Sequence, residues 1–265
     1  MSSYLGFLER YEEGDSFLHK ADARLKLVLT LGFIFSLTAL PPGSWWALGV
    51  LYALLWTTVL ASRISVAGLL KRTLLAAPFI LIALPIVFTR PDPYFWEAAV
   101  GPLQLHASYD GFIFFLTTLL KSWLSVTAAL LLTITTPFQQ ILEGLRFLRI
   151  PLVLVSIVSF MYRYLFVLVD EVLRLLRARE ARSASIGLRT GGSMAWRAKV
   201  TGGMAASLFL RTYDRSERIY MAMLARGYDG KQRETIQHGI APSQLALGIA
   251  TLAGFAMIVL AARIW

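Results

Sequence analysis

The sequence contains no cysteine among its 265 residues, and only 16% of them are charged. The absence of cysteine excludes disulfide bonds and thiolate metal sites. Water-soluble domains carry about 25% charged residues, so this chain has little polar surface to present to water. The histidines, His19, His106 and His238, stand far apart, without the paired spacing of a metal site on a helix. We therefore expect no metal site and no cofactor in this chain.

Hydrophobic residues supply 57% of the sequence, and the formal net charge is +10. The apolar excess is typical of a polytopic membrane protein. In such proteins Lys and Arg gather in cytoplasmic loops, so we attribute the positive charge to membrane topology. We expect the lipid bilayer as a partner and no nucleic acid.

Long uncharged runs predict about five transmembrane helices, because a span needs about 20 mostly apolar residues. The first run, 27–62, is broken by prolines and a glycine at 41–44, which predicts a hairpin of two short spans. The other predicted spans are 73–89, 112–135 and 239–262. Residues 1–26 lack the pattern of a cleaved signal peptide, so we expect the first span to remain as an anchor.

The apolar segment 150–169 contains Arg163, and the distribution of charge decides how we assign it. If this segment crosses the membrane, basic loops fall on both faces. If it does not cross, most of the 26 Lys and Arg residues share one face, as the positive-inside rule favours. We therefore predict five spans, with the N-terminus in the cytoplasm and the C-terminus outside. Segment 150–169 then lies in the membrane interface or buried against other helices.

Between the fourth and fifth spans the sequence predicts three amphipathic helices, which we term coupling helices, at about 138–148, 151–186 and 195–224. Three glycines in 187–193 indicate a turn. That stretch lacks the Gly-Lys-Ser/Thr ending of a phosphate-binding loop, so we expect no nucleotide site in it. Asp170 and Arg174 have the i,i+4 spacing of a helical ion pair.

These assignments give an all-α polytopic membrane protein with about five transmembrane helices and three cytoplasmic or interfacial coupling helices. The predicted parts are the N-terminal transmembrane helices (1–136), the cytoplasmic coupling-helix region (137–238) and the C-terminal transmembrane helix (239–265). No predicted span contains His, Asp or Glu, which argues against an intramembrane enzyme. We expect a structural partner for Lys121 in the fourth span and similar packing or pairing for Arg163. A stand-alone secondary transporter would need more intramembrane charges.

Two similar tripeptides close the second and third coupling helices, namely Ala181-Arg182-Ser183 and Ala225-Arg226-Gly227. The negative end of a helix favours a guanidinium, whose planar fork of donors binds carboxylates. The small neighbours leave room for a partner surface, and Gly227 tolerates the left-handed backbone that often ends a helix. In the alternative interpretation these helices only pack, with a basic face in solvent or near anionic lipid.

Residues 160–230 carry the most specific resemblance to a known family. The matching stretches are Met161-Tyr162-Arg163-Tyr164-Leu165-Phe166, Asp170-Glu171, Ala178-Arg179-Glu180-Ala181-Arg182-Ser183, Leu208-Phe209-Leu210-Arg211, Ser216-Glu217-Arg218 and Ala222 through Gly230. With Asp22-Ala23-Arg24-Leu25-Lys26-Leu27, they resemble the transmembrane T component of energy-coupling factor (ECF) transporters, closest to the CbiQ type of cobalt and nickel systems. The resemblance covers essentially the whole chain. Ser183 stands where many members have glycine.

The resemblance implies a multi-pass protein of the prokaryotic cytoplasmic membrane that joins two ATP-binding cassette ATPase subunits, CbiO-like, to a substrate-binding membrane subunit, CbiM-like. A small accessory membrane subunit is a further implied partner. ATP and Mg²⁺ then belong to the ATPase subunits, and this chain is a non-catalytic permease subunit. The implied substrate is cobalt or nickel. A T component of a vitamin transporter is the main alternative.

The resemblance also implies roles for particular residues. Arg182 and Arg226 would each enter a groove of one ATPase, and the small residues Ala181, Ser183, Ala225 and Gly227 would permit the close fit. ATP binding would draw the ATPases together, shift the coupling helices and tip the substrate-binding subunit. The implied contacts with that subunit are Leu152, Leu165, Phe166, Met204 and Leu208.

Overall fold

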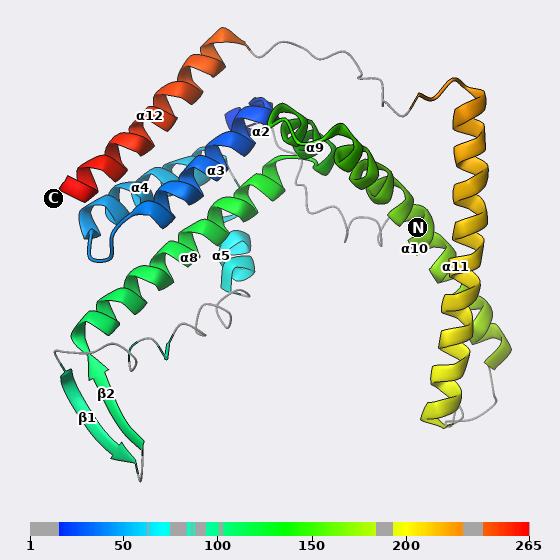
Figure 1. The fold of residues 1–265 in the computed structure, drawn as a ribbon, viewed down its shortest axis with the longest axis horizontal. Helices are drawn as coiled ribbons and strands as arrows, with labels where there is room; N and C mark the ends of the chain where they lie inside the picture. Colours follow the sequence, from blue (N-terminus) through cyan, green and yellow to red (C-terminus); the bar gives the residue numbers. More distant parts are fainter. Residues whose placement is uncertain are drawn as a thin grey trace. The chain divides into compact units, whose positions relative to one another are not determined.

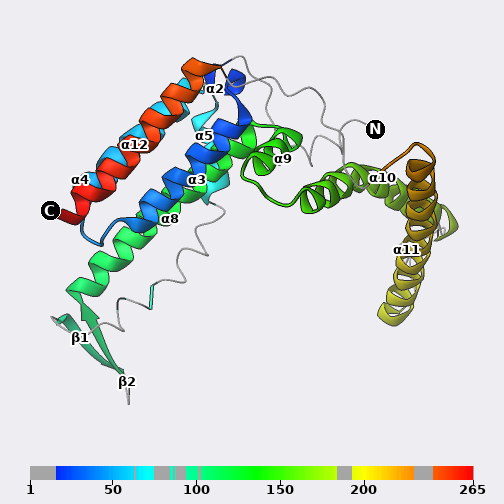
Figure 2. The ribbon, with the colours of Figure 1, turned by 45° about the horizontal axis from the view of Figure 1, so that its top comes forward.

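The computed structural model describes residues 16–62, 64–74, 84–85, 87, 94–100, 103–183, 193–229 and 241–264. The chain divides into two compact units. Unit 1 combines Met1–Phe147 with His238–Trp265, and unit 2 is Leu148–Gln237. Figures 1 and 2 show the helices of both units.

Unit 1 is built mainly from helices. In chain order its described helices are α2 (Phe17–Lys20), α3 (Ala23–Ala39), α4 (Trp45–Ala61), α5 (Val66–Leu74), α8 (Tyr109–Thr135), α9 (Phe138–Phe147) and α12 (Pro242–Ile264). Helix α3 packs against α8, α9 and α12, while α4 and α5 pack against α8. Figure 1 shows α3, α4, α8 and α12 side by side. The predicted all-α polytopic membrane fold is confirmed in this architecture.

The first two long helices form where the sequence predicts a broken hydrophobic run. Helix α3 follows Asp22, whose Oδ1 accepts a hydrogen bond from the backbone N–H of Arg24 at 2.9 Å. Such an N-cap satisfies one of the free donors of a helix start. The chain reverses where Gly43 has a φ of +87°. Each helix has 17 residues and is therefore about 25 Å long, so the predicted pair of short helices is confirmed.

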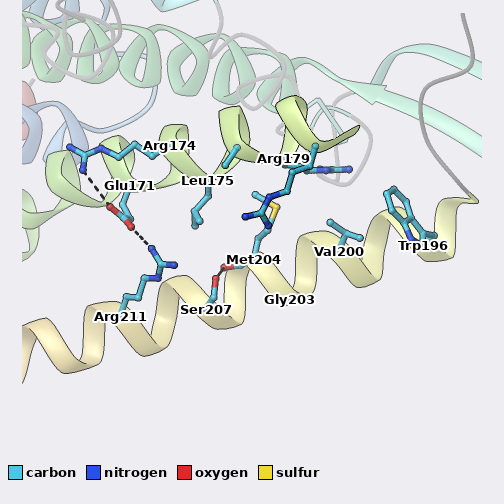
Figure 3. A pocket seen from close by; sticks show the side chains of 12 residues that line it. Glu171, Arg174, Leu175, Arg179, Trp196, Val200, Gly203, Met204, Ser207 and Arg211 are labelled. Carbon is cyan, nitrogen blue, oxygen red and sulfur yellow. Dashed lines mark hydrogen bonds and ion pairs between the residues drawn. The ribbon is translucent and has the colours of Figure 1, made fainter. Parts of the chain in front are cut away.

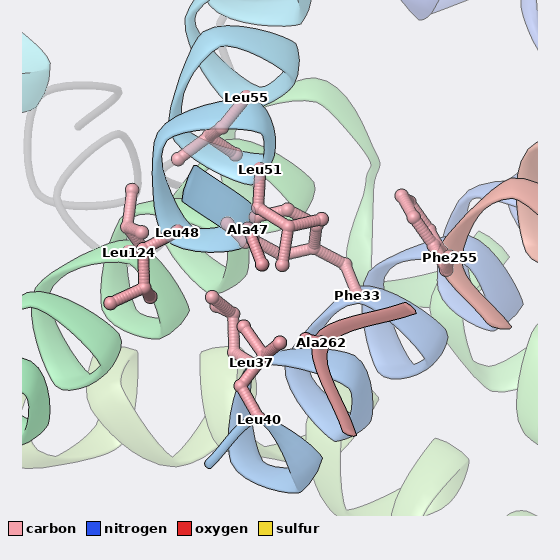
Figure 4. Packing of buried hydrophobic residues seen from close by; sticks show 11 residues of the cluster. Phe33, Leu37, Leu40, Ala47, Leu48, Leu51, Leu55, Leu124, Phe255 and Ala262 are labelled. Atoms are coloured by element: carbon pink, nitrogen blue, oxygen red, sulfur yellow. The ribbon is translucent and has the colours of Figure 1, made fainter. Parts of the chain in front are cut away.

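A cluster of buried apolar side chains holds α3, α4, α8 and α12 together (Figure 4). Leu37 and Leu51 are fully buried in it. The rings of Phe33 and Phe255 meet edge to face, with their centroids 5.7 Å apart. The other members are Leu40, Ala47, Leu48, Leu55, Leu124, Ala128 and Ala262. Burial of this set draws the four helices into one bundle.

The faces of these helices that point away from the cluster are apolar as well. Phe35 in α3, Leu60 in α4 and Met257 in α12 are 72%, 66% and 71% exposed. Helices that are apolar on every face belong in a nonpolar solvent. Among the described helices, three are long and apolar enough to cross a membrane: Tyr109–Thr135, Leu152–Arg182 and Pro242–Ile264. Helix α4 is a shorter apolar helix.

Some of the predicted spans coincide with described helices and others do not. Helices α8 and α12 occupy the predicted spans 112–135 and 239–262. The predicted span 73–89 falls mostly outside the described residues. Segment 150–169 begins a helix that has the length and composition to cross a membrane. Most of that segment is not buried, so the expected burial against other helices is wrong for the described chain. Five spans, and placement of the segment in the interface, stay predictions.

Glycines allow α3 and α12 to approach closely. A side chain at Gly32 of α3 would meet the Cδ2 of Leu252 at 2.6 Å, and one at Gly248 of α12 would collide with Leu25. A side chain at either position would therefore require the facing leucine to change rotamer or the two helices to move apart. Both glycines therefore favour the observed close packing of α3 and α12.

Helices α3 and α8 each supply a lysine that donates a hydrogen bond to the C-terminal end of the other helix. The buried Nζ of Lys26, at the start of α3, donates to the carbonyl oxygen of Thr135 at 3.2 Å and to Oγ1 of Thr136 at 3.3 Å. In return, Nζ of Lys121 in α8 donates to the carbonyl oxygen of Leu40 at 2.6 Å. Each ammonium thus satisfies a carbonyl at the negative end of the other helix. The structural partner expected for Lys121 is therefore Leu40.

A β-hairpin precedes α8, and the helical prediction did not include it. Strand β1 (Tyr94–Val100) pairs antiparallel with β2 (Leu103–Ser108), and Val100 opposes Leu103. Short hydrophobic runs do not by themselves distinguish a strand from a helix. The hairpin adds to the all-α architecture without replacing any predicted span.

Unit 2 contains two helices of 32 residues each, α10 (Leu152–Ser183) and α11 (Met194–Ala225). These are the second and third predicted coupling helices, and their positions are confirmed. The first predicted coupling helix is α9, which packs on α3 in unit 1, where Gly144 faces Leu27. None of the described residues of α11 is buried. The pair therefore presents most of its side chains outward.

Candidate functional site

Helices α10 and α11 are joined by an ion pair at their crossing. The side chain of Glu171 accepts a hydrogen bond from Nη1 of Arg211 at 2.9 Å and lies 4.0 Å from Nη1 of Arg174 (Figure 3). Glu171 is only 16% exposed, whereas the two arginines are 67% and 61% exposed. The predicted pair of Asp170 with Arg174 is wrong, because Glu171 rather than Asp170 faces the seam.

A groove of about 850 Å³ runs along this seam. Arg179 bridges it by donating from Nη1 to Oγ1 of Thr201 at 3.4 Å. Since Glu171 meets Arg211 and Arg179 meets Thr201, the two helices run antiparallel. The charged residues that line the groove are Arg174, Arg179, Arg182, Arg211 and Glu171. Its electrostatic character is therefore strongly positive.

The first predicted tripeptide lies at the last turn of α10. Ala181 and Arg182 are exposed, and α10 ends at Ser183. Arg182 lines the end of the groove together with Trp196, and it makes no hydrogen bond or ion pair within the described ranges. Its guanidinium stands where the helix terminus carries partial negative charge. The predicted turn after it, 187–193, lies almost entirely outside the described residues.

The second tripeptide ends α11 with a defined backbone motif. Arg226 is the C-cap, and Gly227 follows with a φ of +79°. The N–H of Gly227 donates to the carbonyl of Leu224 at 2.9 Å, and the N–H of Tyr228 to that of Met223 at 3.0 Å. This pair of bonds is a Schellman motif, which requires a left-handed residue at the glycine position. The predicted helix-ending role of Gly227 is confirmed.

The structure leaves the second arginine available. Ala225, Arg226 and Gly227 are all exposed. The Arg226 guanidinium has no hydrogen-bond or ion-pair partner among the residues that the structure describes. A side chain on Gly227 would meet nothing within 4 Å, so the glycine is needed for its backbone conformation rather than for space inside this chain.

The two arginines are far apart. Trp196 shares the groove end with Arg182, and Arg226 lies 30 residues farther along α11. At 1.5 Å per residue this separation is about 45 Å. One small ligand cannot bind both guanidinium groups. We term residues 181–183 and 225–227 the first and second arginine tips. Their separation suits two separate binding surfaces.

The residues assigned to a contact with the substrate-binding subunit are distributed over both helices. Leu152 at the start of α10 is 50% exposed, while Leu165, Phe166, Met204 and Leu208 are half-buried. Met204 lines the groove, and the ring of Phe166 packs on Tyr162 with centroids 5.1 Å apart. The structure does not gather them into one patch.

Other strongly exposed apolar residues lie on the same helices, some within the implied contact surface of about 152–166 and 204–209 and some beyond it. On α10 they are Val153, Leu154, Ile157 and Met161, and on α11 they are Phe209, Leu210, Tyr213, Tyr220, Met221 and Leu224. The spacing of Phe209, Tyr213 and Tyr220 already places them on one helical face. Sequence alone could not show that this face has no partner within the described chain.

Three other predicted positions need comment. Arg163 is exposed and has no partner in the described chain, so the expected packing or pairing is wrong there. His19 lies beside Ser16, with Nδ1 and Oγ 2.6 Å apart. His238 falls outside the described residues. Within the described ranges no group of three His, Cys, Asp or Glu side chains is placed to hold a metal ion.

Comparison with known proteins gives the chain its relatives. The family model for CbiQ, cobalt transport protein, matches residues 14–236. An uncharacterized protein of Methanocaldococcus jannaschii is 26% identical over 263 residues, which cover 96% of this chain and 86% of the relative. The energy-coupling factor transporter transmembrane protein EcfT of Listeria innocua is 25% identical over 261 residues, covering 93% of this chain and 95% of the relative.

A second EcfT, from Limosilactobacillus fermentum, is 26% identical over 258 residues, covering 90% of this chain and 91% of the relative. The family match includes both helices of unit 2 and both arginine tips. The chain belongs to the CbiQ family and is a transmembrane T component of an energy-coupling factor transporter.

Proposed function

We propose that this chain transmits the motions of two ATPase subunits to a substrate-binding membrane subunit, with one ATPase docked on each arginine tip. The observation that carries this proposal is the pair of exposed guanidinium groups, Arg182 and Arg226, which have no partner among the described residues and lie at helix ends about 45 Å apart. The names of the Listeria and Limosilactobacillus relatives support an assembly with ATPase and substrate-binding subunits.

The chemistry of each tip suits an acidic groove. An arginine forms two parallel hydrogen bonds with a carboxylate, which gives strength and a fixed orientation. Ala181, Ala225 and Gly227 have little or no side chain, so a protein surface can close around the arginine. Closure excludes water, and a desolvated ion pair depends strongly on both of its partners. We infer that Ser183 completes the first tip in the same way.

The crossing of α10 and α11 provides the means of transmission. Glu171 binds arginines from both helices, so a displacement of one tip acts on the other helix through this seam. A helix of 32 residues is about 48 Å long and moves as a stiff lever. We assign the contact with the substrate-binding subunit to Leu152, Leu165, Phe166, Met204 and Leu208.

We propose cobalt as the transported substrate, with nickel as the related choice, because the matching family model is described as a cobalt transport protein. The partners are then two CbiO-like ATPases, which carry ATP and Mg²⁺, a CbiM-like subunit and a small accessory membrane subunit. A vitamin transporter is the second candidate, because the EcfT names of the curated relatives specify no metal. In either case this chain performs no catalysis and holds no cofactor.

The proposal is tested by reversing the charge of both tips. We expect Arg182→Glu with Arg226→Glu to lose the ATPase subunits during purification and to abolish cobalt uptake, because each acidic groove would then meet a like charge. The matched control is Arg177→Glu with Arg218→Glu, which changes the same helices by the same charge at exposed positions away from the tips. Normal ATPase retention and uptake in the tip variant would refute the role of the tips.

The cargo is tested separately from the docking. Membranes that contain the complete assembly are expected to take up radioactive cobalt with ATP, and excess nickel to compete with it. Uptake of a vitamin in place of either metal would favour the second candidate while leaving the docking role intact.

A further inference from the structure

Helices α10 and α11 enclose a second, smaller cavity of about 330 Å³. It lies along the C-terminal half of α11, beyond the end of the groove where Glu171 meets Arg211. Its wall is mostly apolar or aromatic, with Phe160, Tyr164 and Leu168 from α10 and Ile219 and Tyr220 from α11. Concave apolar pockets with a few polar groups are typical ligand sites.

One charged side chain, Arg215, lines this cavity among the described residues. It is half-buried, and within the described part of the chain it makes no hydrogen bond or ion pair. A guanidinium that loses water without gaining a partner is unfavourable, and an anion in the cavity would restore its hydrogen bonds. No carboxylate of the described chain lines the cavity to fill that role.

The surroundings of the cavity are apolar surface. Met161 beside it on α10 is 59% exposed, and Tyr213 and Met221 on α11 are 61% and 58% exposed. Tyrosine and arginine together are typical of the level where a membrane meets water. The ligand that matches one cation above an exposed apolar surface therefore has a single anionic group and a long apolar body.

We propose that this cavity binds an anionic phospholipid, with its phosphate on Arg215. Ser216, whose Oγ donates to the carbonyl oxygen of Tyr213 at 2.8 Å, also lines the cavity and offers its hydroxyl oxygen as an acceptor for a lipid hydroxyl. The apolar wall covers the glycerol backbone and the first methylenes, and the acyl chains follow the exposed residues of both helices. Arg215 on α11 lies 11 residues before Arg226, although Met223 near the second tip also lines the cavity, and the proposal does not depend on the docking role.

The test measures lipid binding to the purified full-length protein by native mass spectrometry. Dioleoylphosphatidylglycerol and dioleoylphosphatidylcholine, which share their acyl chains, are titrated in parallel. We expect the anionic lipid to bind at least about tenfold more tightly, because both lipids carry the phosphate but the quaternary ammonium of phosphatidylcholine would repel the Arg215 guanidinium. Inorganic phosphate alone is expected not to compete, since it lacks the apolar body.

Two variants locate the binding. Arg215→Gln is expected to weaken the binding of phosphatidylglycerol about tenfold. The matched control is Arg218→Gln, which removes the same charge from an exposed position three residues farther along α11 and should leave binding nearly unchanged. Ile219→Trp keeps the arginine but fills the cavity, so it should weaken both lipids. If Arg215→Gln fails to fold, Ile219→Trp still tests the site, because unchanged lipid binding in that variant would exclude this cavity.

Equal binding by the Arg215 and Arg218 variants would overturn the proposal, as would equal affinity for the two lipids. Full displacement of the lipid by inorganic phosphate would assign the cavity to a free anion. Loss of phosphatidylglycerol from the site when the complete transporter is assembled would assign it to a segment of a partner protein.

Discussion

Replacing Gly227 by alanine should weaken the second tip without removing its arginine. Gly227 has a φ of +79° and supports the two backbone bonds that close α11 behind Arg226. An L-residue with a side chain pays about 1–2 kcal/mol for the left-handed conformation. That free energy corresponds to a factor of about 5–30 in the population of the correct tip. We expect ATPase affinity at this tip to fall by the same factor.

Two further variants separate conformation from space. Gly202 lies in the same helix, where an added Cβ meets nothing within 4 Å and no positive φ is required. Gly202→Ala should therefore stabilise α11 by about 0.5–1 kcal/mol and leave docking intact. Asparagine tolerates the left-handed region better than alanine but is larger. If backbone conformation controls the tip, Gly227→Asn will bind the ATPase better than Gly227→Ala.

The assay is the dissociation constant between the reconstituted full-length chain and its ATPase, measured by titration. The variants share one background that carries Arg182→Glu, so that only the second tip binds. Amide exchange at Tyr228 reports whether the Schellman bonds of the tip remain closed. Wild-type affinity in Gly227→Ala would refute the conformational argument. A larger loss in Gly227→Asn than in Gly227→Ala would show that close approach of the partner is what requires glycine.

Three other predictions concern topology and packing. Because the chain lacks cysteine, Pro42→Cys and Ala195→Cys can be labelled singly with an impermeant maleimide on intact cells. Five spans place the two positions on opposite faces and predict labelling at 42 only, whereas labelling at both positions or at neither would place them on the same face and mean that segment 150–169 crosses. Gly248→Val should lower the stability in thermal unfolding by about 1–3 kcal/mol because the added side chain collides with Leu25. Gly254→Val, where a side chain has open space, should lower it less. Equal melting temperatures of the two variants would contradict this packing. Lys26→Met should lower the stability by about 1–2 kcal/mol because the carbonyl oxygen of Thr135 loses its hydrogen bond, while Lys71→Met at an exposed position should leave the stability unchanged. Unchanged stability in Lys26→Met would contradict the importance of this hydrogen bond.

The long helices were predictable because their signals are local. Uncharged runs, the break at 41–44, and Gly227 at a helix end each act within a few residues of the chain. The hairpin at 94–108 was not predicted, because a short apolar segment is compatible with either a strand or a helix. The distribution of Lys and Arg predicts which loops face the cytoplasm, and the packing of the helices does not test that prediction.

The candidate site was predictable only in part. The tripeptides are visible in the sequence, and helix geometry puts their arginines at helix ends. The choice between Asp170 and Glu171 as partner of Arg174 depends on the rotation of α10 against α11, and the sequence favoured the wrong one. Arg163 was likewise expected to pair, yet its side chain is exposed.

By itself the sequence determined a helical membrane protein, the positions of its long helices, and two basic helix ends, because hydrophobic run length and helix termination depend on neighbouring residues. The tertiary structure decided that Lys26 and Lys121 cap the opposite helices, that Gly32 and Gly248 meet bulky leucines, and that Arg215 lines an apolar cavity. Those contacts join residues far apart in the chain, so they exist only once helices pack at one spacing and rotation.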